Sequence, residues 1–568
     1  MRIVAAALAC AFVAVLGQLG RIQYLQHDKY EALARGQHFT KVEIPVRRGT
    51  ITDCRGNPLA ISLPVQSLYA DPKNVKQKSV AAWKLAPVLD MEPQDIFARL
   101  IRRRRFVWIK RRLTDEEHKK VRGLELKGIG FRREYRRVYP QGMLLGQALG
   151  FCGIDDNGLD GLELYLEEYL AGRPGYRTTR RDVAGNKIAA SRLKREPAVK
   201  GQDVALTVDS NIQRIAEEEL NKACEQWRAA SGVAIVMEPA TGDILALVNW
   251  PFFDPGAFRG LSAAELRTRS HNTAALDVYE PGSTFKPFAV SAALEEKVVT
   301  PETVFDCGNG SAVLNGRRLR DAHRLGKLTV AEIVTFSSNI GVGRIALRLG
   351  EEKLYEYVKA FGFGRVAGLP AACEPAGLLS PPREWSRYTI TSIPMGQEVA
   401  VTPVQLTAAY SALAMSGKLM KPRLLKAIVD PDTNRIVKKF PARQAGQVIS
   451  PQTARDITEM LVQVVENERG TGRKARIDNY ILAGKTGTAQ KSLPDGRGYS
   501  PTDYVASFVA FAPAYRPRLC VLIKIDTPRG CNYGGTVAAP AVREIIRRTL
   551  AYLDVPPVTK SLASIDPG

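Results

Sequence analysis

A serine and a lysine stand three residues apart where the sequence predicts the beginning of a helix. Ser283 and Lys286 follow the turn-forming pair Pro281-Gly282 and open an apolar, periodic segment. Residues three apart share one face of a helix, so the lysine can approach the serine hydroxyl. A serine becomes a good nucleophile when a base takes its proton, and a lysine shielded from water can be neutral enough to act as that base. An ordinary helix start followed by a surface lysine has the same pattern.

A second polar group, Ser337-Ser338-Asn339, separates two apolar segments that have helical periodicity. These segments lie near residues 328–336 and 342–349. The Ser337 hydroxyl is a candidate proton relay, and the Asn339 amide is a candidate hydrogen-bond donor to a substrate. Polar residues between two helices also form plain turns, so the group is not diagnostic when taken alone.

The third group is Lys485-Thr486-Gly487-Thr488, which follows the strand-like residues 480–483. On a strand, Lys485 and Gly487 point to one side and the two threonines to the other. A glycine there lets the backbone of a substrate approach closely, although it is also typical of a simple bulge. We therefore treat these four residues as candidates for substrate binding and proton transfer.

The elements that would position these groups come from distant parts of the chain. A turn around Pro239 and Gly242 joins two β-rich segments and predicts a hairpin. A helix is predicted after residue 541, with Val542, Ile545, Ile546 and Leu550 on one face. The middle of the region, roughly 283–470, has mostly helical patterns. The predicted strands are residues 233–237, 244–248, 480–486, 504–512 and 519–526. We expect an α+β fold, with one antiparallel sheet flanked by helices on both faces.

The N-terminus predicts a membrane anchor. Residues 3–17 carry no charge, and with the next three residues the segment is long enough to cross a bilayer. Only Met1 and Arg2 precede it, so we expect a short cytoplasmic end and export of the chain after about Arg21. A cleaved signal peptide is the main alternative, and a lipoprotein site at Cys10 is a weaker one.

The segment between the anchor and the predicted sheet is polar and rich in arginine, and glycines and prolines interrupt it. It predicts an extended pedestal domain. The expected division is an anchor at 1–22, the pedestal at 23–228 and a catalytic domain at 229–568. The arginine runs at 102–105 and 132–137 are interpreted mainly as solvated faces.

Composition narrows the possible partners. The chain has 81 Lys and Arg against 58 Asp and Glu, a formal net charge of +23, which favours anionic partners such as lipid headgroups. No nucleic-acid-binding motif accompanies this charge, so we expect no nucleic acid partner. The eight cysteines are scattered without close pairs, and no histidine cluster has the spacing of metal ligands. We expect neither a metal nor another cofactor, while disulfide pairing stays open.

The order Ser-x-x-Lys, Ser-x-Asn, Lys-Thr-Gly resembles that of penicillin-binding proteins and β-lactamases. Over nearly its whole length the chain is similar to class B penicillin-binding proteins, which are monofunctional transpeptidases. Two departures are Cys54, where the family usually has arginine, and His271-Asn272-Thr273, where it usually has Arg-Asn-Arg; Arg55 is a candidate substitute for the first. The segments that carry the resemblance are Arg48–Asp53, Gly158–Glu163, Arg181-Asp182 with Gly185, Tyr279–Lys286, Met395–Gln397, Val401–Pro403, Gly484–Gln490 and Tyr533–Pro540.

The resemblance implies a peptidoglycan D,D-transpeptidase that crosslinks stem peptides and is acylated by β-lactams. Ser283 would attack the D-alanyl-D-alanine carbonyl, with Lys286 as its base. The N–H groups of Ser283 and Thr488 would form the oxyanion hole. The relay residues would be Ser337 and Lys485, and the substrate-binding residues Asn339, Thr486, Gly487 and Thr488.

Several alternatives stay open at this stage. A D,D-carboxypeptidase or a β-lactamase would use the same groups, and a scaffold or a β-lactam sensor would not turn over substrate. Since no glycosyltransferase region precedes the pedestal, we expect a monofunctional enzyme. The segment from Arg181 to Gly185 looks closer to the division-specific branch than to the elongation branch. By analogy, we expect a catalytic domain on the outer side of the membrane, with a polytopic glycosyltransferase and other divisome proteins as partners.

Overall fold

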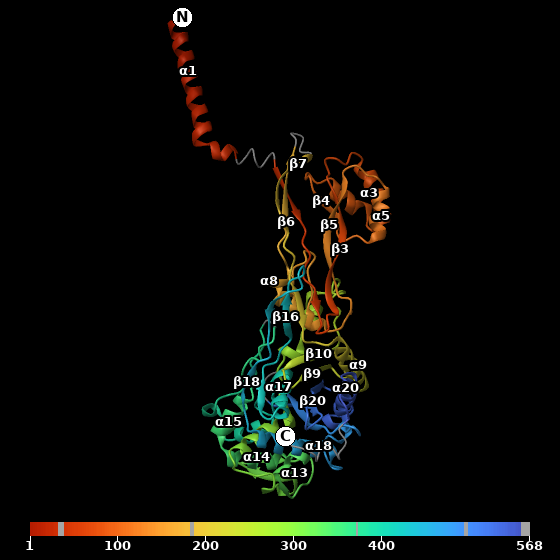
Figure 1. Cartoon of the computed structure of the whole chain (residues 1–568), viewed down its shortest axis with the longest axis vertical. Helices are drawn as coiled ribbons and strands as arrows, with labels where there is room; N and C mark the ends of the chain where they lie inside the picture. Colours follow the sequence, from red (N-terminus) through yellow and green to blue (C-terminus); the bar gives the residue numbers. More distant parts are fainter. Residues whose placement is uncertain (32–38, 182–186, 371–372, 494–497, 558–568) are drawn as a thin grey trace. The chain divides into compact units, whose positions relative to one another are not determined.

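The computed structural model describes residues 1–31, 39–181, 187–370, 373–493 and 498–557, which fall into two compact units (Figure 1). The chain passes between the units several times, so neither is a single continuous segment. The first unit comprises residues 1–49, 62–136 and 169–202, and the second comprises residues 50–61, 137–168 and 203–568.

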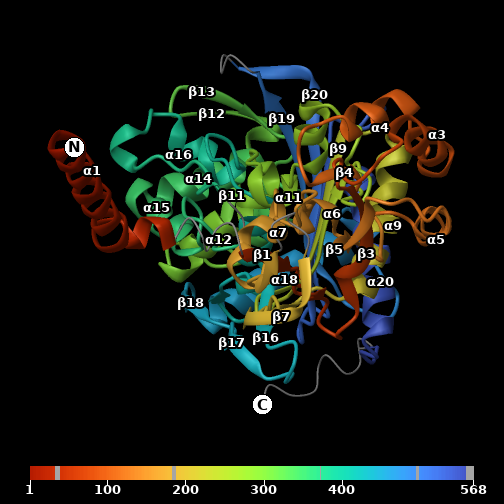
Figure 2. The ribbon, with the colours of Figure 1, turned by 90° about the horizontal axis from the view of Figure 1, so that it is seen from above.

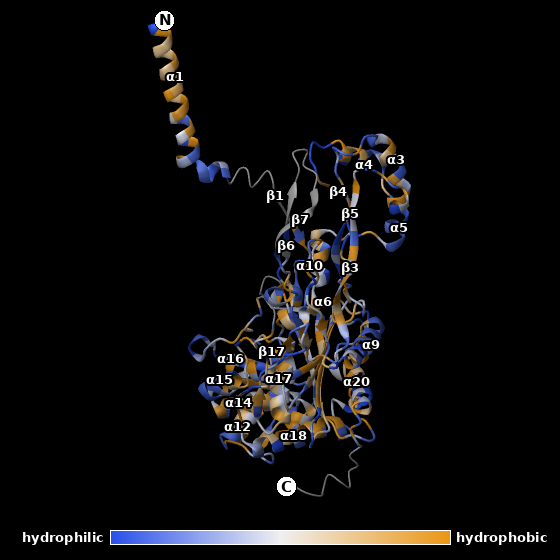
Figure 3. Cartoon of the chain, turned by 45° about the horizontal axis from the view of Figure 1, so that its top comes forward, coloured by the Kyte–Doolittle hydropathy of each residue, from blue (hydrophilic) through white to orange (hydrophobic). Residues whose placement is uncertain are grey.

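Helix α1 (Arg2–Gly20) begins the first unit and continues into a π-helical turn, Arg21–Leu25. None of its residues is buried, and its surface is largely apolar (Figure 3). Over residues 2–25 it is long and apolar enough to cross a membrane, and it is the one such helix among the residues that the structure describes. This agrees with the expected single-pass anchor, although a signal sequence has the same properties.

The rest of the first unit contains a small α/β core and a separate sheet. Apolar residues of α3, α4 and α5 pack against β3, β4 and β5. In the separate three-stranded sheet, β6 lies between β1 and β7. Strand β6 ends at Arg181, while Asp182 and Gly185 lie outside the described residues. The elements are α3 (Lys78–Leu89), α4 (Pro93–Leu100), α5 (Asp115–Gly123), β3 (Pro58–Ala70), β4 (Val107–Lys110), β5 (Ile129–Val138), β1 (Phe39–Ile44), β6 (Gly175–Arg181) and β7 (Lys187–Glu196).

The second unit is built on a five-stranded sheet with the order β10-β9-β21-β20-β19, and every neighbouring pair is antiparallel. The hairpin and the three later strands that the sequence predicts are all present. Strand β19 lies at one edge of this sheet and carries the Lys-Thr-Gly group. The strands are β9 (Ser231–Glu238), β10 (Asp243–Trp250), β19 (Ala483–Ser492), β20 (Tyr499–Ala512) and β21 (Leu519–Asp526).

Helices cover both faces of this sheet, as expected (Figure 2). On one face, α9 (Ser210–Gln226) and α20 (Ala539–Tyr552) share a core with alternate strand residues such as Val236 and Val521. The predicted apolar face of α20 is buried in this core. On the other face, α17 (Pro403–Ala414) bonds to Met237 and Cys520. Helix α9 precedes the expected domain boundary between residues 228 and 229 but packs on the sheet that follows it. The position of that boundary stays a prediction.

The region 283–470 is less uniformly helical than its sequence pattern predicts. Its helices include α12 (Lys286–Glu295), α13 (Val330–Phe336), α14 (Asn339–Leu349), α15 (Glu351–Ala360) and α18 (Pro451–Glu466). Short strand pairs lie between them, and one pair, β12 (Ser311–Leu314) with β13 (Arg317–Arg320), is a hairpin beside the site described below. Two further short pairs are β11 (Val304–Asp306) with β14 (Lys327–Thr329) and β15 (Lys418–Met420) with β18 (Gln444–Gln447).

A second sheet in this unit holds the segment around Asp53. Strands β2 (Ile51–Thr52), β8 (Asp203–Leu206), β16 (Leu425–Val429) and β17 (Ile436–Lys439) are neighbours in it. The buried Asp53 carboxylate accepts hydrogen bonds from the backbone and the hydroxyl of Ser210. Arg55, which follows the unusual Cys54, forms an ion pair with Asp209 at 2.7 Å. Arg55 therefore contacts the N-cap of α9, and its role as a substitute for the missing arginine stays a prediction.

One arginine differs from its expected setting. Arg137 belongs to a run that was interpreted as a solvated face, yet its side chain is 2% exposed and its Nε lies 2.6 Å from Oε1 of Glu163, which is fully buried. A buried guanidinium is tolerated because the carboxylate compensates its charge. The run at 102–105 is exposed as expected. The error arose because a run of like charges gives no sign of a partner 26 residues away.

Candidate active site

Ser283 lies in a short 3-10 turn, Gly282–Phe285, that leads directly into α12. The predicted helix start is therefore present, with Lys286 as the first residue of the helix. Gly282 has φ 56° and its N–H donates to the Gly396 carbonyl at 3.1 Å. A Cβ on Gly396 would lie 2.7 Å from the carbonyl carbon of Gly282, so the Met-Gly-Gln segment packs against the serine turn through glycine alone.

The two predicted lysines meet at the Ser337 hydroxyl. Nζ of Lys286 lies 3.1 Å from Oγ of Ser337, and Nζ of Lys485 lies 2.8 Å from the same atom. Lys286 also donates to the Ser337 carbonyl at 2.5 Å. The Ser283 hydroxyl makes no hydrogen bond within the described part of the chain, so Lys286 contacts Ser337 rather than the predicted nucleophile. Bonds between catalytic groups are often formed only when substrate is bound.

Ser337 has an uncommon backbone conformation. It ends α13 with φ 62° and ψ 41°, in the left-handed region that residues other than glycine seldom adopt. This conformation ends the helix and turns the chain so that the Ser337 carbonyl and hydroxyl both face Lys286. Such strain is often found at functional sites, where the surrounding structure compensates its cost.

Burial changes the proton affinity of both lysines. Lys286 and Lys485 are fully buried. Loss of hydration disfavours the charged amine and lowers the pKa of Lys286 to about 7, while the Asp321 carboxylate partly opposes this effect. Burial, together with the nearby Lys286 charge, places the pKa of Lys485 well below its usual value. At neutral pH a substantial fraction of Lys286 is therefore neutral and able to accept a proton.

Asp321 is a site residue that the sequence did not reveal. Its Oδ1 accepts from the backbone N–H groups of Asn339, at 2.5 Å, and Ile340, at 3.1 Å, and its Oδ2 accepts from the Ser338 hydroxyl at 2.6 Å. It therefore caps α14 and fixes the Ser-x-Asn group while influencing Lys286. It precedes the group that it caps by 17 residues, so no local pattern could have identified it.

Along strand β19 the side chains of the Lys-Thr-Gly-Thr group alternate between two faces, as expected. Lys485 reaches Ser337 on one side, and a Cβ added to Gly487 would lie 2.9 Å from Cγ2 of Thr284 on that same side. The threonines turn the other way: the Thr486 hydroxyl donates to Thr471 at 3.0 Å, and the Thr488 hydroxyl accepts from the Gly534 N–H at 3.2 Å. Gly487 therefore lets the strand lie against the serine turn.

A cleft of about 620 Å³ opens over this arrangement. Three of the predicted residues line it, namely Ser283, Asn339 and Thr488. Asn339 donates its side-chain amide to the Arg320 carbonyl at 2.9 Å. The other predicted residues lie behind the wall of the cleft and are not among its lining residues, namely Lys286, Ser337, Lys485, Thr486 and Gly487. The hairpin that carries Arg320 also lines the cleft, and no sequence motif indicated this position.

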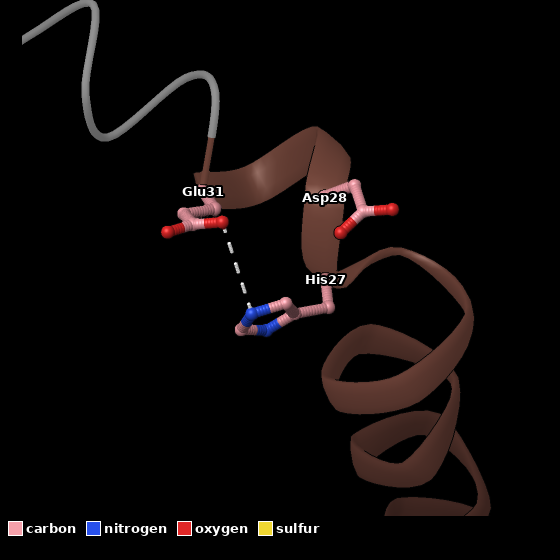
Figure 4. Close-up of side chains that lie close together, drawn as sticks. All are labelled: His27, Asp28 and Glu31. Atoms are coloured by element: carbon pink, nitrogen blue, oxygen red, sulfur yellow. Dashed lines mark ion pairs between the residues drawn. The ribbon is translucent and has the colours of Figure 1, made fainter.

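A possible metal cluster lies elsewhere in the chain. His27, Asp28 and Glu31 follow α1, and their ligand atoms lie within 4.8 Å of one another (Figure 4). All three are exposed, and the His27 Nε2 to Glu31 Oε2 distance is 4.0 Å. Exposed acidic groups commonly lie this close without holding an ion. We therefore assign no function to these three residues.

The arrangement of the site is typical of one class of enzyme, the serine acyltransferases and hydrolases. A serine at a helix start, with buried amines as the nearest bases, supports acyl transfer through a covalent serine ester. Comparison with known proteins identifies the family. The penicillin binding protein transpeptidase domain matches residues 232–547, and the penicillin-binding protein dimerisation domain matches residues 43–206. The chain belongs to the penicillin-binding proteins, and the two domains together confirm class B.

Individual relatives are similar over almost the whole chain. Stage V sporulation protein D of Bacillus subtilis is 35% identical over 552 residues, which cover 96% of this chain and 84% of that protein. Peptidoglycan D,D-transpeptidase FtsI of Escherichia coli is 31% identical over 559 residues, covering 96% and 91%. The crystal structure of penicillin-binding protein 3 from Mycobacterium tuberculosis, complexed with aztreonam, is 27% identical, with a TM-score of 0.71 over 91% of this chain and 98% of that chain. These findings confirm the expected division-type branch.

Proposed function

We propose that this protein crosslinks peptidoglycan stem peptides during septal cell-wall synthesis, through an acyl-enzyme on Ser283. The observation that carries the proposal is the bridge from Lys286 through the Ser337 hydroxyl to Lys485, next to a cleft lined by Ser283. It gives the serine a buried base and gives that base a path for its proton. The name of the Escherichia coli relative supports the same reaction.

In the first half of the reaction, neutral Lys286 accepts the Ser283 proton as Oγ attacks the carbonyl of the penultimate D-alanine. The proton passes through Ser337 to the nitrogen of the leaving D-alanine, and the scissile C–N bond breaks. Lys485 supports this relay by donating to the same hydroxyl. In the second half, an amine of a neighbouring strand attacks the ester, its proton returns to Ser283, and the crosslink is formed.

The cleft supplies the binding groups. The backbone N–H groups of Ser283 and Thr488 stabilise the developing oxyanion, an effect that is typically worth about 3 kcal/mol for each donor. Asn339 holds the peptide, and Gly487 allows its backbone to approach β19. The resemblance implies that Thr486 binds the substrate directly. Its hydroxyl donates to Thr471 instead, so we assign it an indirect role in binding. A β-lactam acylates the same serine, as the complex of the Mycobacterium tuberculosis relative with aztreonam supports.

The chemistry of the substrate and helix α1 support a proposed location. We place the catalytic unit outside the cytoplasmic membrane, held by α1 as a single-pass anchor. Its partners there are a polytopic glycosyltransferase, which supplies new glycan strands, and other proteins of the division site. Fluorescence imaging of the tagged protein in dividing cells tests this part. Septal enrichment is the expected result, and even distribution along the side wall would favour the elongation role.

A transfer assay separates this function from hydrolysis. The full chain in detergent is incubated with a stem pentapeptide donor, with and without an amine acceptor. We expect release of D-alanine together with an acceptor-linked product, and neither with Ser283→Ala. Release of D-alanine with only the hydrolysed peptide at every acceptor concentration would indicate a D,D-carboxypeptidase instead.

A further inference from the structure

Three arginines stand on one hairpin at the edge of the active-site cleft. Strands β12 and β13 are joined by Asn315 and Gly316, which have φ of 49° and 79°, as expected for a tight hairpin turn (Figure 2). Leu314 and Leu319 are buried, and a Cβ added to Gly343 of α14 would lie 3.1 and 3.4 Å from their methyl groups. The hairpin is therefore packed on the helix that begins with Asn339.

The same hairpin presents a concentrated positive charge to the cleft. Arg317, Arg318 and Arg320 line the cleft together with Ser283, and none of its thirteen lining residues is acidic. No ion pair in the described part of the chain involves any of the three arginines. None of the three charges is thus neutralised by a direct ion pair among the described residues.

The three guanidinium groups differ in how firmly they are held. Arg317 donates from Nη1 to the Ser392 hydroxyl at 3.0 Å and lies over the Tyr388 ring, 5.9 Å from its centroid. Its Nε is buried and has no hydrogen-bond partner, which is rare for a buried N–H group. Arg318 and Arg320 are exposed and alternate with the buried Leu319 along β13, so both lie on the face of the strand opposite to Arg317. Arg318 and Arg320 are therefore two adaptable cations on one face, and Arg317 is a fixed cation on the other.

The hairpin is also joined to the catalytic residues through the backbone. The Arg320 carbonyl accepts the side-chain amide of Asn339, and the next residue, Asp321, caps α14. A ligand that orders the arginines therefore lies in a fixed position relative to the Ser-x-Asn group. Because Ser283 and the hairpin line one cleft, a peptide that acylates Ser283 can place the residues that precede its D-alanines beside the hairpin.

We propose that Arg318 and Arg320 form a subsite for a second carboxylate of the donor peptide, on the side chain that precedes D-alanyl-D-alanine. A guanidinium presents parallel N–H donors that match a carboxylate, and the cleft holds no acid that would compete for them. The inference rests on the proposed function, because it assumes a peptide donor. It adds a preference for an acidic donor over its amidated form.

The test uses two soluble donors that differ by one charge. N-acetyl peptides ending in glutamate-D-Ala-D-Ala or glutamine-D-Ala-D-Ala are compared by kcat/KM for D-alanine release, with the full chain in detergent. Wild-type protein should prefer the glutamate donor by about tenfold, the effect expected of one partly exposed charged hydrogen bond. Arg318→Gln with Arg320→Gln should bring this ratio close to one, and added salt should lower it in the wild type. Arg348→Gln, at an exposed position on α14, is the matched control and should keep the ratio.

The remaining outcomes are distinguishable. Wild-type protein that is acylated by benzylpenicillin but treats the two donors alike would overturn the subsite and leave the proposed function intact. Failure of acylation itself would contradict the proposed function. Phosphate is the other anion that these arginines would suit, as in a lipid-linked precursor. Inhibition by inorganic pyrophosphate that is lost in the double variant, without discrimination between the donors, would assign the arginines to phosphate and overturn the carboxylate proposal.

Discussion

Nζ of Lys485 lies 2.8 Å from Oγ of Ser337, although the two residues are 148 positions apart in the sequence. Lys286 approaches the same oxygen at 3.1 Å. A hydroxyl oxygen can accept two hydrogen bonds and still donate its own proton. Ser337 can therefore accept from both amines while its proton stays available to a third group, such as Ser283 or a leaving amine. This is the property that a proton relay requires.

The first prediction concerns the pH dependence of acylation. Lys286 must be neutral to act as a base, and burial lowers its pKa to about 7. The rate of acylation by benzylpenicillin should therefore fall about tenfold for each pH unit below that value and level off above it. The apparent pKa belongs to the coupled pair of lysines. A rate that stays constant between pH 5 and 8 would contradict Lys286 as the base.

Asp321→Asn should shift this profile. The Asp321 carboxylate raises the pKa of Lys286, so its removal should move the midpoint to lower pH. The asparagine oxygen can still accept from the N–H groups at the start of α14, which limits the structural cost. Stopped-flow measurement of acylation across the pH range checks the sign of the shift. A midpoint displaced to higher pH would contradict the conclusion that the Asp321 carboxylate raises the pKa of Lys286.

Ser337→Ala should slow acylation by about a hundredfold or more, the usual contribution of a positioned proton-transfer group. The substitution removes the oxygen on which the two amines converge. Ser291→Ala is a suitable control because that hydroxyl is also buried and donates only to the Pro287 carbonyl within α12. Second-order rates of penicillin acylation should be reduced in the first variant and unchanged in the second. Equal rates in both would remove Ser337 from the mechanism.

Gly487→Ala should reduce acylation at least about tenfold, because the added Cβ forces β19 away from the serine turn. That atom would lie 2.9 Å from Thr284 Cγ2 and 3.1 Å from the Pro281 carbonyl, and closer still to the Ser507 hydroxyl. Gly446→Ala is matched to it, since no atom lies within 4 Å of the added Cβ and φ is not positive there. Labelling and thermal unfolding are measured for both variants. Normal labelling of Gly487→Ala would mean that the close approach is unnecessary.

Sequence patterns could single out the three candidate groups because each lies on an element with a strong local signature. Lys485 follows an apolar strand, and Ser337 lies where two helical periodicities stop. Contacts between distant residues gave no such signature. Gly396 is compatible with any turn until it is seen against Gly282, and Arg137 resembled its exposed neighbours until Glu163 was placed beside it. The short hairpin at 311–320 was missed because two four-residue strands are too brief for a clear alternation.

The ester on Ser283 should be long-lived. Rapid hydrolysis requires a base that activates water, which class A β-lactamases supply as a glutamate. None of the described residues that line the cleft is acidic. Two acids close in sequence to the candidate catalytic segments are bonded to other side chains: Glu398 accepts from Thr389 at 2.6 Å, and Asp277 pairs with His271 at 2.5 Å. Labelled protein freed of excess drug should keep its label over many turnover times. Rapid loss of label, with many drug molecules consumed per enzyme, would identify a hydrolase.

The site of acylation tests the central claim most directly. The full chain is incubated with benzylpenicillin and digested, and the modified peptide is identified by mass spectrometry beside that of Ser283→Ala, whose folding is checked by thermal unfolding. The wild type should carry one penicilloyl group, located on Ser283, and the folded variant should carry none. Stoichiometric labelling of the variant, or an ester on any other residue of the wild type, would contradict Ser283 as the nucleophile.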